Sequence, residues 1–206
     1  MLTHRHARGF TLIEVLVSLV IIALMMVIGL PSMTTYFQNS KISTAAQTYV
    51  AGLQTARTEA IRRNLAVDFV LTDTDVALPG AANAAAPSGT GRNWMVRWLN
   101  PVTAAFEAIE SKSALEGSGQ VAGSTPAITV AGSAVLPAAV FSGVVTFNGF
   151  GASNSASVIL LDINNPTGGA CFPAGTMRCL RVRVTPGGQI RACDPQLPAV
   201  DSRSCT

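Results

Sequence analysis

The sequence predicts an α+β protein in which one long N-terminal helix precedes a head built on an antiparallel β-sheet. Two observations carry this prediction: helical periodicity continues from Phe10 to Asn64, and the sequence after Ala66 consists of short apolar runs separated by turn residues. Several short strands that follow a single long helix are typical of this class. The length agrees, because 206 residues suit one medium-sized domain with an anchor rather than two full domains.

The predicted helix begins with an apolar stretch, Phe10 to Leu30, which is long enough to cross a hydrocarbon core of ~30 Å. The basic segment at residues 4–8 should stay in the cytoplasm by the positive-inside rule, which places the rest of the chain on the other side of the membrane. A cleavable secretory signal is the alternative. The length of the run, the lack of an A-x-A site after it and the carboxylate of Glu14 inside it all argue against that alternative.

Residues 31–64 form the second, amphipathic half of the same predicted helix. Glu59 can pair with Arg63 at i,i+4, and Asn64 is placed to cap the C-terminus. The apolar positions recur at steps of three and four residues: Ile42, Ala46, Tyr49, Leu53, Ala56 and Ala60. We expect this stripe to pack against the sheet of the head.

The head is expected to occupy residues 65–206. Ala-, Gly-, Ser- and Pro-rich segments at Pro79–Arg92 and Glu116–Pro126 are expected to be loops. Trp94 and Trp98 share one face of their strand, where they should pack beneath the helix. The candidate strands are Val67–Leu71, Trp94–Leu99, Ala127–Ala131, Val144–Phe147, Val158–Asp162, Leu180–Val184 and Gln189–Ala192.

Four cysteines lie close to the C-terminus: Cys171, Cys179, Cys193 and Cys205. Their spacing matches no common zinc pattern, and an even number in a looped segment rich in Pro and Gly indicates two disulfides and an oxidising compartment. Free buried thiols in a cytosolic protein are the alternative.

The cysteine spacing leaves the connectivity open, and we favour a nested pattern. Cys179 and Cys193 are nearly equidistant from the turn at Pro186–Gly187, so antiparallel pairing should place them opposite one another. Cys171 would then pair with Cys205. The sequential pattern, Cys171–Cys179 with Cys193–Cys205, is the alternative.

Nothing in the sequence points to catalysis or to a cofactor. None of the common nucleophile, phosphate-loop, zinc-protease or dinucleotide motifs is present, and both histidines, His4 and His6, precede the apolar stretch. Asp73 and Asp75 lie two residues apart among turn residues, where a solvated loop is the better interpretation than a metal or acid–base pair. We therefore expect no catalytic residue, no metal ligand and no cofactor.

Residues 8–16, R-G-F-T-L-I-E-V-L, resemble the class III signal of type IV prepilins and type II secretion pseudopilins. The resemblance implies that residues 1–9 are a leader cut after Gly9 by a prepilin peptidase on the cytoplasmic face. Phe10 would become the N-methylated first residue, and residues 10–30 the transmembrane and filament-core segment. Pro31 falls where many pilins carry a helix-bending proline.

The position of Glu14 fits that assignment. Cleavage exposes a positive amine on Phe10, and Glu14 lies one helical turn away. Neither charge is stable alone in a low-dielectric helical bundle, so a carboxylate that reaches a neighbour's terminal amine would neutralise both and fix the axial stagger between subunits. A charge merely tolerated near the interface is the alternative.

The remaining sequence resembles the GspH/FimT/FimU group of minor pilins. The similarity is carried by residues 56–64 (A-R-T-E-A-I-R-R-N), 93–98 (N-W-M-V-R-W), 145–151 (V-T-F-N-G-F-G) and the final hairpin, 180–193. It implies a structural minor pilin that helps to prime or cap a type IV pilus. Its implied partners are other minor and major pilins, the prepilin peptidase, the inner membrane and the pilus assembly platform. The resemblance also implies that the head lies in the periplasm and that the subunit later becomes part of an extracellular pilus. An H-type minor pseudopilin of type II secretion is the alternative.

Basic residues in the C-terminal hairpin suggest DNA as an alternative partner. Arg181 and Arg183 project from one face of a strand, and Arg191 could join them across the turn, which gives three guanidiniums suited to phosphate. FimT-type relatives bind DNA through a G-R-x-R motif. The matching residues here are G-Q-I-R at 188–191, without the first arginine, so we favour a solvated strand face.

Overall fold

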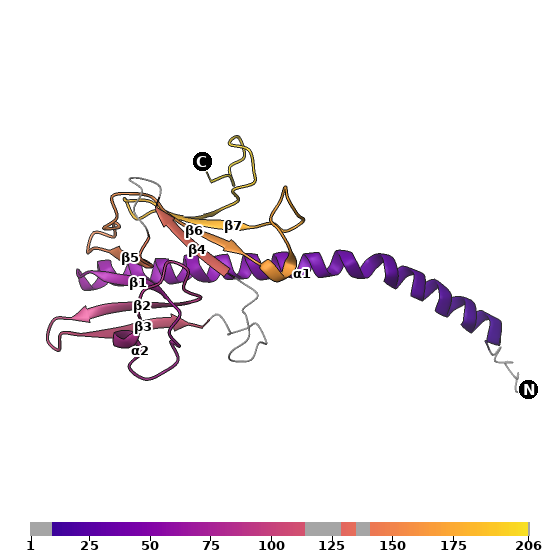
Figure 1. Ribbon diagram of the computed structural model, residues 1–206, viewed down its shortest axis with the longest axis horizontal. Helices are drawn as coiled ribbons and strands as arrows, with labels where there is room; N and C mark the ends of the chain where they lie inside the picture. The colour runs from indigo at the N-terminus through magenta and orange to yellow at the C-terminus, as the bar shows by residue number, and fades with distance from the viewer. Residues whose placement is uncertain (1–9, 114–128, 135–140, 206) are drawn as a thin grey trace, which may run out of the picture. The chain divides into compact units, whose positions relative to one another are not determined.

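One helix runs through both compact units of the chain. The computed structural model describes residues 10–113, 129–134 and 141–205, without the side chains of residues 27–32. It divides the chain into residues 1–37 and 38–206. Helix α1 (Leu12–Arg63) has 52 residues and continues from the first unit into the second (Figure 1).

Helix α1 agrees with the sequence-based boundaries to within two residues at each end. It ends with Arg62 and Arg63 in its last turn, where cations are favoured by the helix dipole. Asn64 adopts a left-handed conformation (φ 52°), and the Leu65 N–H donates back to the Ala60 carbonyl at 3.3 Å. The predicted role of Asn64 as a C-terminal cap is thereby confirmed.

The head contains two antiparallel four-stranded sheets, where the sequence predicted one. The first sheet, in spatial order, is β3 (Ala105–Lys112), β2 (Asn93–Asn100), β1 (Val67–Thr72) and β5 (Val144–Phe147). The second is β4 (Thr129–Ala134), β6 (Ile159–Asn164), β7 (Leu180–Val184) and β8 (Ile190–Cys193). Short helical turns occur at α2 (Ala81–Ala84) and η1 (Pro166–Gly168).

Strand β3 and helix α2 are absent from the sequence-based prediction. Strand β3 reads A-F-E-A-I-E-S-K, and Ala and Glu are residues that strands disfavour. It becomes a strand because the chain reverses after Asn100, whose carbonyl accepts from the Ala104 N–H at 2.9 Å, and then pairs along β2. The expected strand Ala127–Ala131 overlaps β4 only from Thr129, and the expected loop Glu116–Pro126 lies outside the described residues.

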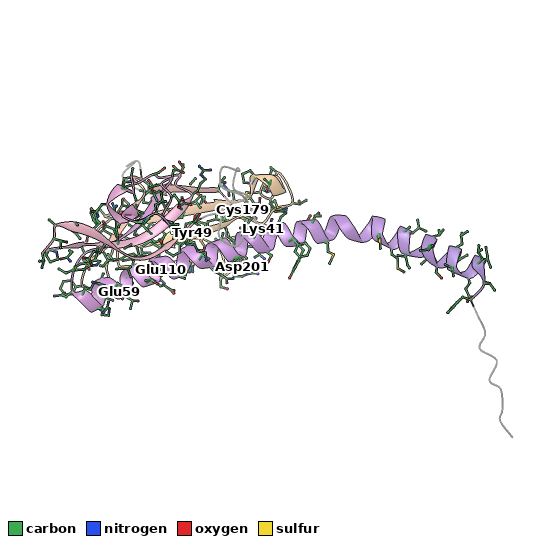
Figure 2. The ribbon with its side chains drawn as sticks, turned by 90° about the horizontal axis from the view of Figure 1, so that it is seen from below. Lys41, Tyr49, Glu59, Glu110, Cys179 and Asp201 are labelled. Carbon is green, nitrogen blue, oxygen red and sulfur yellow. A yellow bond between two sulfur atoms is a disulfide. The ribbon has the colours of Figure 1, made fainter. Side chains whose placement is uncertain are left out.

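The core of the head lies where α1 meets both sheets. The six predicted stripe residues of α1 are all buried, with 4% exposure or less. They pack with residues from both sheets, such as Phe69 of β1 and Leu161 of β6. Tyr49 lies midway along this stripe (Figure 2), donates to the Arg92 carbonyl at 3.3 Å, and has its pKa raised by burial. Trp94 is 3% exposed in the same cluster, which confirms its predicted position beneath the helix.

The opposite face of the first sheet is covered by the segment that carries α2. Val70 and Met95 pack there against Val76, Ala81 and Ala85. Arg97 of β2 is buried on this face and donates to the carbonyls of Ala82 (2.6 Å) and Ala85 (3.2 Å). Its guanidinium also lies 4.1 Å from the centre of the Phe106 ring, and burial lowers its pKa.

Candidate functional site

The N-terminal half of α1 presents apolar side chains all around its circumference. From Leu12 to Met26 each large aliphatic side chain is exposed, by 48% at the least exposed position, Ile22, and by 83% at Leu12. A helix that is apolar on every side is stable in lipid or among other helices rather than in water. This half of α1 is therefore the first candidate site of assembly.

Glu14 is the acidic residue in the first turn of this helix. Its N–H donates to the Thr11 carbonyl at 3.1 Å and to Thr11 Oγ1 at 3.3 Å, and its carbonyl accepts from Ser18 Oγ at 2.7 Å. Within the described part of the chain, no ion pair with the Glu14 carboxylate is found.

The predicted processing site lies at the edge of the described chain. Gly9 and the leader are outside it, and Phe10, its first residue, is 84% exposed. Among the described residues, no helix combines the length and hydropathy that a membrane span requires. The side chains of residues 27–30, which belong to the expected span, are outside that set, and so is the side chain of Pro31, whose backbone is helical within α1.

The hairpin arginines come together as the sequence predicted. The register of β7 and β8 places Arg183 opposite Arg191, and Arg181 is the next residue on the same face of β7. Arg181 is held by Asp162 of the neighbouring strand β6, with bidentate N–O distances of 2.6 and 3.1 Å. Arg191 donates from Nη2 to the Ser204 carbonyl at 2.5 Å. No local pattern in the sequence indicates Asp162 as the partner of Arg181, because a long connection separates β6 from β7.

All four cysteines form disulfides, but the preferred nested pairing is wrong. The bonds are Cys171–Cys179 and Cys193–Cys205, the sequential pattern. The hairpin turn is centred one residue later than expected, so that Cys193 lies opposite Arg181 rather than Cys179. Cys179 is reached instead by Cys171, with a Cα–Cα distance of 5.6 Å.

The two disulfides are positioned by short backbone contacts that the sequence did not reveal. The backbone of Cys171 forms an isolated β-bridge with that of Met177, which brings the chain close to Cys171 again shortly before Cys179. A second isolated β-bridge joins the backbones of Asp194 and Ser204. It brings Cys205 close to Cys193, with a Cα–Cα distance of 5.0 Å. Asp194 is buried and accepts from Arg178 Nε at 2.6 Å, so an ion pair joins the two disulfide-bonded segments.

The segment from Asn165 to Cys179 is hydrogen-bonded to α1 at the start of the head. The buried Asn165 side chain donates to Gln38 Oε1 at 2.7 Å, and the Arg178 N–H donates to Asn39 Oδ1 at 2.8 Å. The disulfide Cys171–Cys179 closes a loop within this segment. The signal in the sequence was weak: an Asn-Pro-Thr-Gly turn, whose Asn165 Oδ1 also accepts from Thr167 Oγ1 at 2.6 Å.

The other candidate groups of the head are solvated or structural. Asp73 pairs with Arg92 at 3.3 Å, and Asp75 accepts from the Ala77 N–H at 3.0 Å, both in an exposed bend. In the C-terminal loop, hydrogen bonds from Arg203 lower the pKa of Asp201 to about 2. No cluster of three or more His, Cys, Asp or Glu suited to a metal occurs in the described parts of the chain.

A long helix with an exposed apolar N-terminal half, packed on antiparallel sheets that carry two C-terminal disulfides, defines the class of pilins and pseudopilins. Residues 4–30 match the prokaryotic N-terminal methylation motif, and residues 45–188 match the family described as type II transport protein GspH. The chain belongs to this GspH family. It is a minor pilin or pseudopilin of a type IV pilus or of a type II secretion system, and a structural protein rather than an enzyme.

Comparison with solved structures finds matches at low sequence identity. The crystal structure of the type IV minor pilin FimU of Pseudomonas aeruginosa PAO1 matches with a TM-score of 0.51 and 14% identity, over 83% of this chain and 99% of that chain. The minor pseudopilin EpsH from the type 2 secretion system of Vibrio cholerae gives a TM-score of 0.45 and 15% identity, over 76% of this chain and 99% of that chain. No curated protein matches the sequence significantly.

Proposed function

We propose that this chain is a FimU-like minor pilin that helps to prime or cap a type IV pilus. The observation that carries an assembly role is the apolar half of α1, exposed on all sides, with Glu14 one turn from the predicted new N-terminus, Phe10. The likeness to FimU over most of both chains supports the pilus as the machine.

The proposed mechanism is assembly through α1. A prepilin peptidase removes residues 1–9, and the new N-terminus at Phe10 is methylated. Before assembly the subunit is anchored in the inner membrane with its head in the periplasm. Extraction into a bundle of helices then replaces lipid around residues 10–30 with other pilin helices. In that low-dielectric bundle, the Glu14 carboxylate and a neighbour's terminal amine neutralise each other, which offsets the cost of removing both from water. Other minor and major pilins and the assembly platform are the partners.

Deleting the gene in its host tests the proposal against its alternative. We expect fewer surface pili, with secretion of type II substrates unchanged. The opposite result, lost secretion with normal pili, would favour an H-type minor pseudopilin, as the family description suggests. A deletion that changes neither process would contradict both roles.

DNA binding by the hairpin is a second candidate, favoured by the register that places Arg183 opposite Arg191. A mobility-shift assay at a stated low salt concentration tests it, because phosphate contacts weaken steeply as salt rises. Binding that is lost on replacing both arginines with Ala would support it. Equal behaviour of the unchanged chain and the double variant would reject it.

A further inference from the structure

Exposed apolar side chains gather at the end of the head where α1 finishes. The register places the last residues of β2 and β5 beside Val67, the first residue of β1 after the helix, so these elements share this distal end. In the described part of residues 38–206, eight large apolar side chains are exposed, and five of them belong to the distal end. Those five are Ile61, Leu65, Leu99, Val102 and Phe150.

Phe150 is 91% exposed at the apex of a hydrogen-bonded turn, residues 148–152. The Asn148 Oδ1 atom accepts from the Phe150 N–H at 3.0 Å and from the Ala152 N–H at 3.1 Å. The Gly151 N–H donates to the Asn148 carbonyl at 2.8 Å, and Arg57 Nε of α1 donates to the Gly151 carbonyl at 3.0 Å. These bonds fix the backbone of the turn, and a Phe side chain has only two torsion angles, so Phe150 loses little conformational entropy on binding, which is the property of an interface anchor.

The Phe150 turn lies directly on the last turns of α1. Gly151 has a φ of +76°, and a β-carbon there would lie 2.7 Å from Ile61 Cδ1 and 3.1 Å from Arg57 Nε. Ile61 is 50% exposed and Leu65 is 41% exposed. Phe150 therefore projects beside an aliphatic helix end instead of burying itself in the core of its own head.

The charge of the helix end beneath the Phe150 turn indicates the chemistry of its partner. Residues 57–65 of the sequence carry three arginines, at positions 57, 62 and 63, and one carboxylate, Glu59, which gives a net charge of +2. Glu59, labelled near the end of α1 in Figure 2, accepts hydrogen bonds from both Arg62 (2.6 Å) and Arg63 (2.9 Å). Its single negative charge therefore neutralises only one of these two positive charges. A complementary surface offers an apolar pocket with carboxylates at its rim.

We propose that Phe150, Ile61 and Leu65 form a docking surface for the head of a different pilin-class subunit. That subunit has an apolar, acid-rimmed surface. The inference rests on the proposed assembly role. A lone aromatic beside two aliphatic side chains fits a protein pocket better than single-stranded DNA, which needs successive stacking platforms along a basic groove.

Photo-crosslinking in the native host tests this proposal on the full chain. A photoreactive phenylalanine analogue replaces Phe150 in one strain and Val200, which is 94% exposed in the C-terminal loop, in a second strain. We expect a crosslink from position 150 to another pilin-class subunit, identified by mass spectrometry, and a yield at least about tenfold lower from position 200. A crosslink to a second copy of this chain or to nucleic acid, equal yields from both positions, or no crosslink at 150 would overturn the proposal.

Substitution provides the second measurement. Phe150→Ala should lower co-purification with the crosslinked subunit about tenfold or more, as expected for an aromatic anchor, while Val200→Ala leaves it unchanged. The melting temperatures of both variants should equal that of the unchanged chain, because neither side chain contributes to the core. If Phe150→Ala co-purifies normally and restores pili to the deletion strain, this inference fails and the proposed function stands. If the deletion itself has no effect on pili or secretion, the proposed function fails.

Discussion

Gly52 of α1 lies in direct contact with the indole ring of Trp94 on β2. A β-carbon at position 52 would be 2.7 Å from Trp94 Cζ3, 2.8 Å from Cη2 and 3.0 Å from Phe69 Cε2. The absence of a side chain therefore lets the helix approach the first sheet closely. Phe69 and Trp94 stack there with ring centres 5.5 Å apart.

This contact predicts that Gly52→Ala destabilises the head. Overpacking costs about 1–3 kcal/mol, and the better helix propensity of Ala returns up to about 1 kcal/mol, so we expect a net loss of about 1–2 kcal/mol. Urea unfolding of the full chain in detergent, followed by tryptophan fluorescence, measures it. Ala51→Ser, at the neighbouring exposed position, is the control and should change stability by less than about 0.5 kcal/mol. The loss should shrink in a Trp94→Leu background, and equal losses in both backgrounds would show that the contact is not its cause.

The sequential disulfides predict a definite peptide map. Non-reducing digestion should yield Cys171 linked to Cys179 and Cys193 linked to Cys205. Replacing Cys171 and Cys179 together with Ser should lower stability by roughly 2.5 kcal/mol through the loop-closure entropy of the unfolded chain. The same double substitution should weaken the contact between Asn165 and Gln38. We expect this as faster hydrogen exchange of the α1 amides near Gln38. A peptide that joins Cys179 to Cys193 would contradict the structure.

The Glu59 ion pairs predict a dependence of stability on pH. Hydrogen bonds from Arg62 first, and then from Arg63, lower the pKa of Glu59 below its usual range. A lowered carboxyl pKa stabilises the fold fully above the unfolded-state pKa of about 4.3, and this contribution is lost as the pH falls through the folded-state pKa. Glu59→Gln should therefore lower the melting temperature slightly, by about 1–2 °C at pH 7, and the difference should disappear once the pH lies below the lowered pKa of Glu59. A difference that stays constant over this range would refute the linkage.

Much of the fold could be predicted from the sequence because its periodic patterns are strong. The α1 stripe from Ile42 to Ala60 and the strands β5 and β7 lie where apolar periodicity placed them. Strand β3 could not be predicted, since its Ala and Glu residues oppose a strand and only pairing with β2 forms it.

The candidate sites likewise contain some features that local sequence patterns predict and others that only the tertiary structure shows. The clustering of Arg183 with Arg191 follows from strand alternation across one turn, which is local. The disulfide pairing depended on the centre of the hairpin turn, where a shift of one residue moved Cys193 opposite Arg181. The contacts of Asn165 with Gln38 and of Arg181 with Asp162 join residues far apart in the sequence, and no local pattern could have shown them.

Glu14 should matter for assembly and not for membrane insertion. Glu14→Leu makes the helix more apolar, so membrane fractionation should be unchanged. Incorporation into pili, or co-purification with other minor pilins, should fall about tenfold or more, because a neighbour's terminal amine would be left unpaired in the bundle. Val15→Leu, at the adjacent position, is the matched control and should assemble normally. Normal assembly of Glu14→Leu would show that the proposed charge pairing is wrong.

We propose above all that this chain is made as a prepilin and is cut between Gly9 and Phe10. The intact mass of the chain purified from its host membranes tests it most directly. We predict a single species that lacks residues 1–9 and carries one methyl group on Phe10, and an uncut chain when Gly9 is replaced with Val or the prepilin peptidase is removed. A mature N-terminus at any residue other than Phe10, or a Gly9→Val chain that is still cut, would contradict the account.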